Sequence, residues 1–142
     1  MPDAHPGVAY ACEPGLDVEE FRRVLMESGL GAIRPVDGPA RLAAMLSGAG
    51  LIVTARLDTV DRPLVGVSRS ITDGVWCCYL SDLAVCASVQ HRGIGQGLLE
   101  ETRRQAGPGV TLVLISVDAA IGFYERAGMV RLHNGFWHRR TE

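Results

Sequence analysis

The fold of this chain is decided by one stretch, Asp82-Leu-Ala-Val-Cys-Ala-Ser-Val-Gln90-His-Arg-Gly-Ile-Gly95-Gln-Gly-Leu-Leu99. Its first part has the composition of a strand, its middle is a turn that contains glycines, and its last part has the apolar period of a helix. A helix that starts after such a turn directs its free N–H groups and the positive end of its dipole toward one place, where an anion is stabilised. The stretch therefore predicts a strand–helix unit with an anion-binding site at the helix N-terminus.

The glycines of this turn fit some anion-binding loops and exclude others. A dinucleotide-binding loop needs a third glycine at the position of Leu98, and a phosphate loop of the NTPase type needs a lysine, of which the chain has none. Gly93 and Gly95 still suit a close approach of the backbone to a phosphate, and Arg92 adds a charged donor. Taken alone, the pattern also fits an ordinary helix start whose glycines serve only the conformation of the turn.

The composition limits the partners of the protein. The chain has 142 residues, of which 47% are hydrophobic and 21% charged, as in one globular domain. The formal net charge of −2 gives no basic field for nucleic acid. The apolar runs are far shorter than the ~20 residues that cross a bilayer, and Met1–His5 lacks the features of a secretory signal. We therefore expect a cytoplasmic protein that binds neither nucleic acid nor a membrane.

The cysteines predict no metal site. None of the 4 cysteines stands in CxxC spacing, and the adjacent Cys77 and Cys78 would face opposite sides of a strand. Buried, reduced thiols are therefore expected.

The rest of the chain predicts further strands and helices around the central unit. Asp17 and Glu20 form a capping-box pattern, Pro39 suits the first turn of a helix, and Gly128 suits a helix end. The apolar run 111–117 predicts a strand that is buried on both faces. In chain order the predicted elements are strand 8–12, a helix from Asp17 to Gly29, a helix from Pro39 to Gly48, strands 51–57, 64–71 and 75–85, helix 93–105, strand 111–117, helix 119–127, and a hairpin of 129–132 with 135–138.

Two segments resemble the signatures of a known family. Gln90-x-x-Gly93-x-Gly95 resembles the Q/R-x-x-G-x-G/A signature with which the GNAT superfamily of N-acetyltransferases binds the pyrophosphate of acetyl-CoA. Ala120-Ile-Gly-Phe-Tyr124-Glu-Arg-Ala-Gly128-Met129 is similar to the family's A-x-x-F-Y-E-K-x-G-F run. One helix and one strand separate the two segments, as in that family. The resemblance implies one domain over 1–142 with an α/β fold of the α+β type, in which a central, mixed, mostly antiparallel sheet is flanked by about four helices.

The resemblance also implies a reaction and a set of binding residues. Acetyl-CoA is the implied co-substrate, without a metal, and the acceptor is a primary amine of a small molecule or protein that attacks directly in a ternary complex. A homodimer is left open. In the family, backbone N–H groups at the end of the fourth strand stabilise the developing oxyanion, and Val85 is the matching position. The residues implied to contact the cofactor are Leu83, Ala84, Val85, Gln90, His91, Arg92, Gly93, Ile94, Gly95, Gln96 and Tyr124.

Two residues are candidates for the catalytic proton transfers. Tyr124 stands at the family's general-acid position, where a phenol protonates the leaving thiolate; the alternative is a packing role like that of Phe123. Asp82 is a candidate base acting through water, since a buried carboxylate is costly unless it is used or paired; the alternative is that it accepts hydrogen bonds from a neighbouring strand. Arg34 either binds an acceptor carboxylate or has a surface partner.

The sequence leaves two functions open. The first is an N-acetyltransferase, which Tyr124 favours. The second is a non-catalytic acyl-CoA-binding module of the same fold, for which Cys86, Val89 and Val117 leave room because relatives often carry other side chains there.

Overall fold

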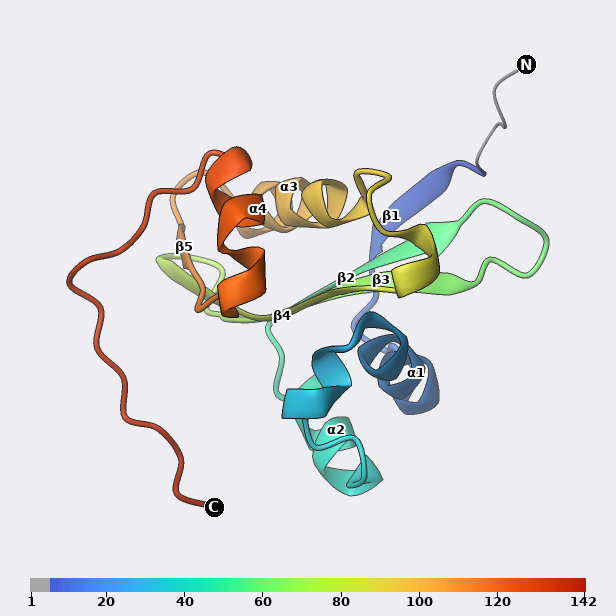
Figure 1. The fold of residues 1–142 in the computed structure, drawn as a ribbon, viewed down its shortest axis with the longest axis horizontal. Helices are drawn as coiled ribbons and strands as arrows, with labels where there is room; N and C mark the ends of the chain where they lie inside the picture. Colours follow the sequence, from blue (N-terminus) through green and yellow to red (C-terminus); the bar gives the residue numbers. More distant parts are fainter. Residues whose placement is uncertain (1–5) are drawn as a thin grey trace.

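The computed structural model describes residues 6–142, so Met1–His5 and the expectation about a secretory signal lie outside the described residues. A five-stranded sheet in the order β1-β2-β3-β4-β5 forms the centre; α3 and α4 lie on one side of it, and α1 and α2 on the other (Figure 1). The strands are β1 (Val8–Cys12), β2 (Leu51–Leu57), β3 (Leu64–Thr72), β4 (Cys77–Val85) and β5 (Thr111–Val113). The helices are α1 (Val18–Ser28), α2 (Pro39–Ser47), α3 (Ile94–Ala106) and α4 (Ile121–Arg126), with short 3₁₀ turns η1 (Leu30–Ile33), η2 (Ala87–Val89) and η3 (Asp118–Ala120).

The sheet is mixed and mostly antiparallel, which confirms the predicted fold class. Strands β1 to β4 are antiparallel neighbours, whereas β5 runs parallel to β4. The parallel pair is short: it joins Cys77 to Thr111, Cys78 to Leu112 and Tyr79 to Val113. Because β4 continues to Val85, the two strands part beyond Tyr79.

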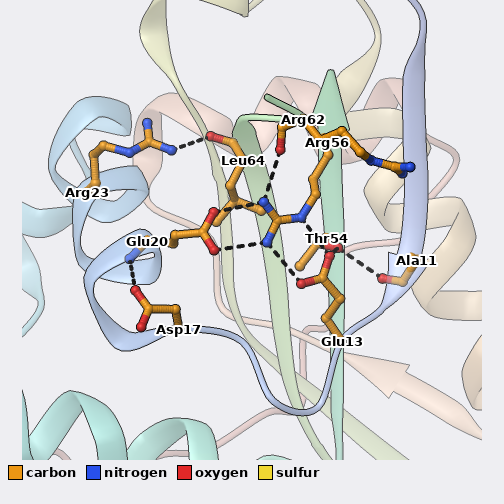
Figure 2. A network of polar contacts seen from close by, with 9 residues as sticks. All are labelled: Ala11, Glu13, Asp17, Glu20, Arg23, Thr54, Arg56, Arg62 and Leu64. Carbon is orange, nitrogen blue, oxygen red and sulfur yellow. Dashed lines mark hydrogen bonds and ion pairs between the residues drawn. The ribbon is translucent and has the colours of Figure 1, made fainter. Parts of the chain in front are cut away.

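Arg56 on β2 connects the start of α1 to the sheet. Its guanidinium donates to Glu13 at 2.8 and 3.0 Å and to Glu20 at 2.8 and 3.1 Å (Figure 2). The Arg56 guanidinium also holds the pKa of Glu13 below its usual value. Since Glu13 follows β1 and Glu20 lies in α1, these contacts fix the helix against β2.

The helix α3 lies unusually close to the sheet. A Cβ atom added to Gly97 would lie 2.2 Å from the Tyr10 hydroxyl oxygen, so a larger residue there would displace the Tyr10 ring. A Cβ atom added to Gly66 of β3 would lie 2.9 Å from a Leu98 methyl carbon. The hydroxyls of Ser68 and Thr102, both buried, share a hydrogen bond of 2.7 Å between β3 and α3. These contacts set the position of the α3 N-terminus beside the end of β4.

The predicted boundaries differ from the structure at the start of β4. The strand begins at Cys77 and not at residue 75, because the Asp73 carboxylate accepts from the N–H groups of Val75, Trp76 and Cys77 at 2.9, 2.8 and 3.2 Å. These three bonds hold the residues in a turn.

The prediction of a long strand 111–117 buried on both faces was wrong. The strand ends at Val113, and Ile115 and Val117 are exposed. Beyond Val113 no strand of residues 6–142 lies beside this run, so its apolar residues are neither paired nor covered.

The prediction of a terminal hairpin was also wrong. The prediction of helix 119–127 before it agrees with η3 and α4. The turn η3 leads into α4, and Gly128 ends the helix in the left-handed region at φ 87°. Residues 129–142 then form no strand and run past β5 as an extended segment (Figure 1). Strands of four residues form few bonds, and the short β5 offers little edge to support them.

Candidate active site

The loop that leads into α3, residues Gln90–Gln96, is called the entry loop here. Its backbone turns sharply at His91 (φ 65°) and Gly93 (φ 81°), both in the left-handed region. The first helical bond runs from Gly97 N to Gly93 O at 2.9 Å, and Gly93 caps the helix without a side-chain bond. The N–H groups of residues 94–96 therefore precede the helical ladder and stay free to bind an anion.

The side chains of the entry loop divide between anchoring and exposure. Ile94 is buried and fixes the first turn of α3 on the core. Gln90 donates from Nε2 to the carbonyl oxygen of Val85 at 3.0 Å, which ties the loop to the end of β4. His91 and Arg92 are exposed, and Arg92 precedes the free N–H groups of the helix start by two residues in the chain. Positive charge and unpaired donors thus coincide at one helix end.

Gly95 has a packing role that the sequence did not predict. A Cβ atom there would lie 3.2 Å from the ring of Phe123 in α4. Phe123 in turn meets Tyr124 edge-on, with ring centroids 5.0 Å apart. The two signature segments are therefore in contact, and Gly95 provides the space for that contact.

The backbone of Val85 faces the gap between the parted strands. Val85 lies opposite Gly66, and the Cys86 N–H donates to the Val65 carbonyl at 2.8 Å. This pattern makes Val85 and Gly66 a non-hydrogen-bonded pair, so the Val85 N–H points away from β3. It points to the side on which β5 has already separated from β4, where it has no strand partner.

A cleft of about 430 Å³ lies at this end of β4. One wall is the end of α1 with η1, another is the end of β4, and Gln90 and Val117 complete it. Its lining consists of Ser28, Gly29, Leu30, Ala32, Ile33, Leu83, Ala84, Val85, Gln90 and Val117. Of the predicted binding residues, Leu83, Ala84, Val85 and Gln90 line this cleft. Residues 91–96 lie in the adjoining entry loop.

Asp82 of β4 lies in a closed ion cluster behind the η1 wall of the cleft. It is fully buried, and its two carboxylate oxygens accept from Arg34 Nε at 2.6 Å and from Arg69 Nε. A β-bulge displaces Ser81, whose carbonyl and hydroxyl oxygens accept from Arg34 and Arg69 at 2.9 and 3.0 Å. With both oxygens engaged by guanidinium groups, the geometry favours the structural alternative for Asp82 over the base.

The partners of Arg34 are therefore Asp82 and Ser81. Arg34 follows η1, which forms a wall of the cleft, and its bonds to Asp82 and Ser81 attach that wall to β4. Sequence reasoning missed Arg69; the signal was an arginine inside an apolar strand that lies next to a strand with a buried carboxylate.

Tyr124 does not line the cleft at Val85. It lines a second cavity, of about 770 Å³, between β5, α4 and the chain that follows α4. Burial raises the pKa of the Tyr124 phenol above its usual value, so the phenol keeps its proton at neutral pH. Tyr124 therefore lines a different cavity from Leu83, Ala84, Val85 and Gln90, whereas Phe123, which meets Tyr124 edge-on, lies beside Gly95 of the entry loop.

Cys86, directly after Val85, is a buried thiol. Burial, followed by the neighbouring Glu27 carboxylate, raises the pKa of its thiol to about 11. The reactive thiolate is therefore almost absent at neutral pH. All of the cysteines are free thiols, as expected, but the prediction that they are buried is right only for Cys78 and Cys86 and wrong for Cys12 and Cys77, which are exposed.

Residues 6–142 contain neither a membrane-spanning helix nor a cluster of metal ligands. None of the helices in this range combines the length and the apolar character that a bilayer crossing needs. Within the same range, His, Cys, Asp and Glu side chains form no group of three suited to a metal ion.

The fold and the site define a class of protein that comparison with known proteins identifies. The family described as acetyltransferase (GNAT) domain matches residues 49–130, more than half of the chain. The chain belongs to the GNAT acetyltransferase family. Among curated proteins, none matches it.

Solved structures share the fold at low identity. A GNAT-family acetyltransferase of Streptococcus pneumoniae TIGR4 is 23% identical, with a TM-score of 0.70 over 94% of this chain and 99% of the other. The aminoglycoside N-acetyltransferase AAC(6')-Iy, solved with CoA, is 13% identical, with a TM-score of 0.70 over 99% of each chain. An aminoglycoside acetyltransferase from an uncultured soil metagenomic sample, solved with sisomicin, is 15% identical, with a TM-score of 0.68 over 94% and 97%.

The ion cluster predicts a large stability effect for Asp82→Ala. This change leaves the buried Arg69 and the half-buried Arg34 without their carboxylate, and removal of one partner from a buried ion pair costs about 3–5 kcal/mol. Urea unfolding measures the change in the free energy of unfolding, with the exposed Asp37→Ala as control. Asp82→Asn with wild-type stability but without acetyl transfer would contradict the structural role and support the base.

Proposed function

We propose that this protein is an acetyl-CoA-dependent N-acetyltransferase that transfers the acetyl group to a primary amine by direct attack in a ternary complex. One arrangement carries the proposal: the Val85 N–H lacks a strand partner and faces the cleft beside the free N–H groups of the α3 start. The N–H groups at the start of α3 suit a diphosphate, and the Val85 N–H suits a reactive carbonyl, so together they fit a ligand that carries these groups at its two ends.

The entry loop is the proposed diphosphate site. The N–H groups of residues 94–96 supply backbone donors, and the exposed Arg92 adds a charge-assisted one. The edge of β4 at Leu83 and Val85 lines the cleft, and Gln90 joins the entry loop to Val85, so this edge is the proposed contact for the extended arm of the cofactor. Acetyl-CoA supplies an activated acyl group as a thioester.

The proposed chemistry uses few side chains. The Val85 N–H donates to the carbonyl oxygen on which negative charge develops. A lysine-like amine with a pKa of ~10.4 is deprotonated only about once in 10³ molecules at pH 7, and water in the cleft is the proposed route for its proton. Tyr124, which keeps its own proton at neutral pH, remains the proposed donor to the leaving thiolate.

The side chains that line the cleft indicate which charge the amine acceptor carries. Structural neighbours include acetyltransferases of aminoglycosides, which are polycations. The cleft at Val85 is lined without a charged side chain, so an amine with little further charge is the better proposal. The free thiols fit a reducing, cytoplasmic location.

Thermal melts and an amine panel test the proposed function. Acetyl-CoA at 100 times its dissociation constant should add ~2.7 kcal/mol to the free energy of unfolding. Release of free thiol with a panel of apolar, acidic and polycationic amines then identifies the acceptor class. Stabilisation without turnover on any amine supports the non-catalytic binding module, and no stabilisation contradicts both functions.

The entry loop predicts a specific effect of Gly93→Leu. Gly93 and Gly74 share a positive φ, of 81° and 72°, and in both the space beside the Cα atom is open. Leucine at either position should therefore cost similar stability, about 1–2 kcal/mol. Only Gly93→Leu should weaken acetyl-CoA binding, at least tenfold by calorimetric titration, because only there does the side chain meet the diphosphate. Equal affinities of the two variants would contradict the assignment.

Tyr124→Phe tests the general acid. It removes only the hydroxyl group, and general acid catalysis contributes about 10²–10⁴-fold, so kcat should fall by that factor while the affinity for acetyl-CoA changes little. Tyr79→Phe is the matched control, because Tyr79 lines the same cavity as Tyr124 and lies on β4. Undiminished kcat in Tyr124→Phe would show that the tyrosine serves packing only.

A further inference from the structure

The 3₁₀ turn η1 presents an isoleucine to the cleft at Val85. Ile33 is 57% exposed although it lines the cleft, and Val117, which lines it from the chain after β5, is 45% exposed. An exposed apolar side chain is common by itself, but two from separate segments that line one concave site favour contact with an apolar ligand. The apolar surface of the cleft is therefore available to a substrate.

The backbone of Ile33 is held by the ion cluster behind it. Arg34 donates from Nη1 to the Ile33 carbonyl oxygen at 3.0 Å and from Nη2 to the Ser81 carbonyl oxygen at 2.9 Å, while its Nε binds the buried Asp82. On the other side, a Cβ atom added to Gly31 would lie 3.1 Å from a carbonyl oxygen of α1, so η1 packs closely on that helix. The wall that carries Ile33 is thus fixed to both β4 and α1.

The cleft offers no partner for a second charged group on the acceptor. Among residues 6–142, none of the side chains that line it is charged, and the Ser28 hydroxyl is already engaged with backbone groups of α1 and η1, at 2.9 and 3.2 Å. Carboxylates of the adjoining segments are engaged or lie elsewhere: Glu27 of α1 pairs with Arg23 at 3.0 Å, and Asp118 lines the other cavity. A second charge on the acceptor would therefore lose its hydration without gaining a partner.

The charged group in contact with the Ile33 backbone is positive. The cluster behind η1 contains one carboxylate, Asp82, and two guanidinium groups, Arg34 and Arg69, so its net charge is +1. This charge disfavours a second ammonium group beside Ile33. It does not offer a site for a carboxylate either, because the three nitrogens of Arg34 already donate to Ile33, Ser81 and Asp82.

The volume of the cleft limits the size of the acceptor. At about 430 Å³ it lies near the lower end of the range of about 300–1,000 Å³ for ligand pockets. The proposed acetyl end of the cofactor occupies part of this space at Val85. An alkyl chain or a single aromatic ring fits in the remainder.

We propose that Ile33 determines the specificity for the acceptor, and that the acceptor is a primary monoamine with an apolar alkyl or aryl substituent. The substituent contacts Ile33 and Val117, and the amino group lies toward Val85, where the acetyl carbonyl is expected. This inference rests on the proposed acetyl transfer and narrows the class of its acceptor.

Three amines with the same hexyl chain test the class of acceptor. The far end of the chain is a methyl group in n-hexylamine, a second ammonium group in hexamethylenediamine and a carboxylate in ε-aminocaproate. With saturating acetyl-CoA, kcat/KM from thiol release should be higher for n-hexylamine than for either of the others by about tenfold or more, because the charged ends are desolvated without a partner. Equal or higher values for a charged amine would overturn the inference.

Two variants of the η1 wall test the role of Ile33. Ile33→Asp removes the apolar contact and adds a carboxylate for a second ammonium group, so the ratio of kcat/KM for n-hexylamine to that for hexamethylenediamine should fall by about tenfold or more. Ala32→Asp, at the exposed neighbour that also lines the cleft, keeps Ile33 and should lower the ratio less. Val60→Asp, at a residue that is 99% exposed in the β2–β3 turn, is the control and should keep the wild-type ratio. By calorimetric titration, all three variants should retain the wild-type affinity for acetyl-CoA.

A binding measurement separates failure of this inference from failure of the proposed function. In the isotope-labelled, CoA-bound chain, n-hexylamine should shift the amide resonances of Ala32 and Ile33 more than hexamethylenediamine does at the same concentration. These shifts without turnover of any amine would contradict the acetyl transfer and support the apolar acceptor site. Turnover with an unchanged ratio in Ile33→Asp would overturn the inference and leave the acetyl transfer standing. The absence of both shifts and turnover would overturn both.

Discussion

The parting of β4 from β5 is the constraint on which the rest of the site depends. The parallel pair ends after Tyr79 and Val113, so the last residues of β4 have β3 as their only strand neighbour within residues 6–142. The register with β3 then leaves every second backbone N–H of β4 unpaired, and the Val85 N–H is the one next to the cleft. A continuous parallel pair would satisfy this donor with a β5 carbonyl and close the cleft. The proposed chemistry therefore depends on the Val85 N–H having no partner in the sheet, which leaves it free to donate to the substrate carbonyl.

Buried charge holds the walls of this opening in place. Asp82, Arg69 and Arg34 join β4, β3 and the chain after η1 on the face opposite α3. A buried ion cluster adds little net stability compared with apolar side chains, but it permits only one arrangement of its members. On the other face, Gly97 and Gly95 allow α3 to approach Tyr10 and Phe123 closely. The contacts on both faces of the sheet thus fix the end of β4 relative to the start of α3. They thereby set the distance between the Val85 N–H and the free N–H groups of α3.

The sequence predicted the elements whose signals are local and missed those that depend on the sheet edge. The Asp17 cap, Pro39 at a helix start and the Gly128 stop each act within one turn of the chain, and the structure has them where they were expected. The entry loop was also predicted, because its glycines and its helix are contiguous. The predictions of strand 111–117 and of the terminal hairpin were wrong. Whether these residues form strands depends on what pairs with the edge of β5, and no local sequence pattern encodes that. Likewise Asp82 was recognised as a buried carboxylate, but its partners lie 48 and 13 residues away in the chain.

The amide resonances of an isotope-labelled chain test the central claim most directly, that the unpaired N–H groups at the ends of β4 and α3 receive the two ends of acetyl-CoA. On titration with acetyl-CoA, the account predicts the largest chemical-shift changes at Val85 and at Ile94, Gly95 and Gln96. CoA without the acetyl group should retain the changes at the α3 start and reduce the change at Val85. Changes confined to other residues, with these four amides unmoved at saturation, would contradict the account.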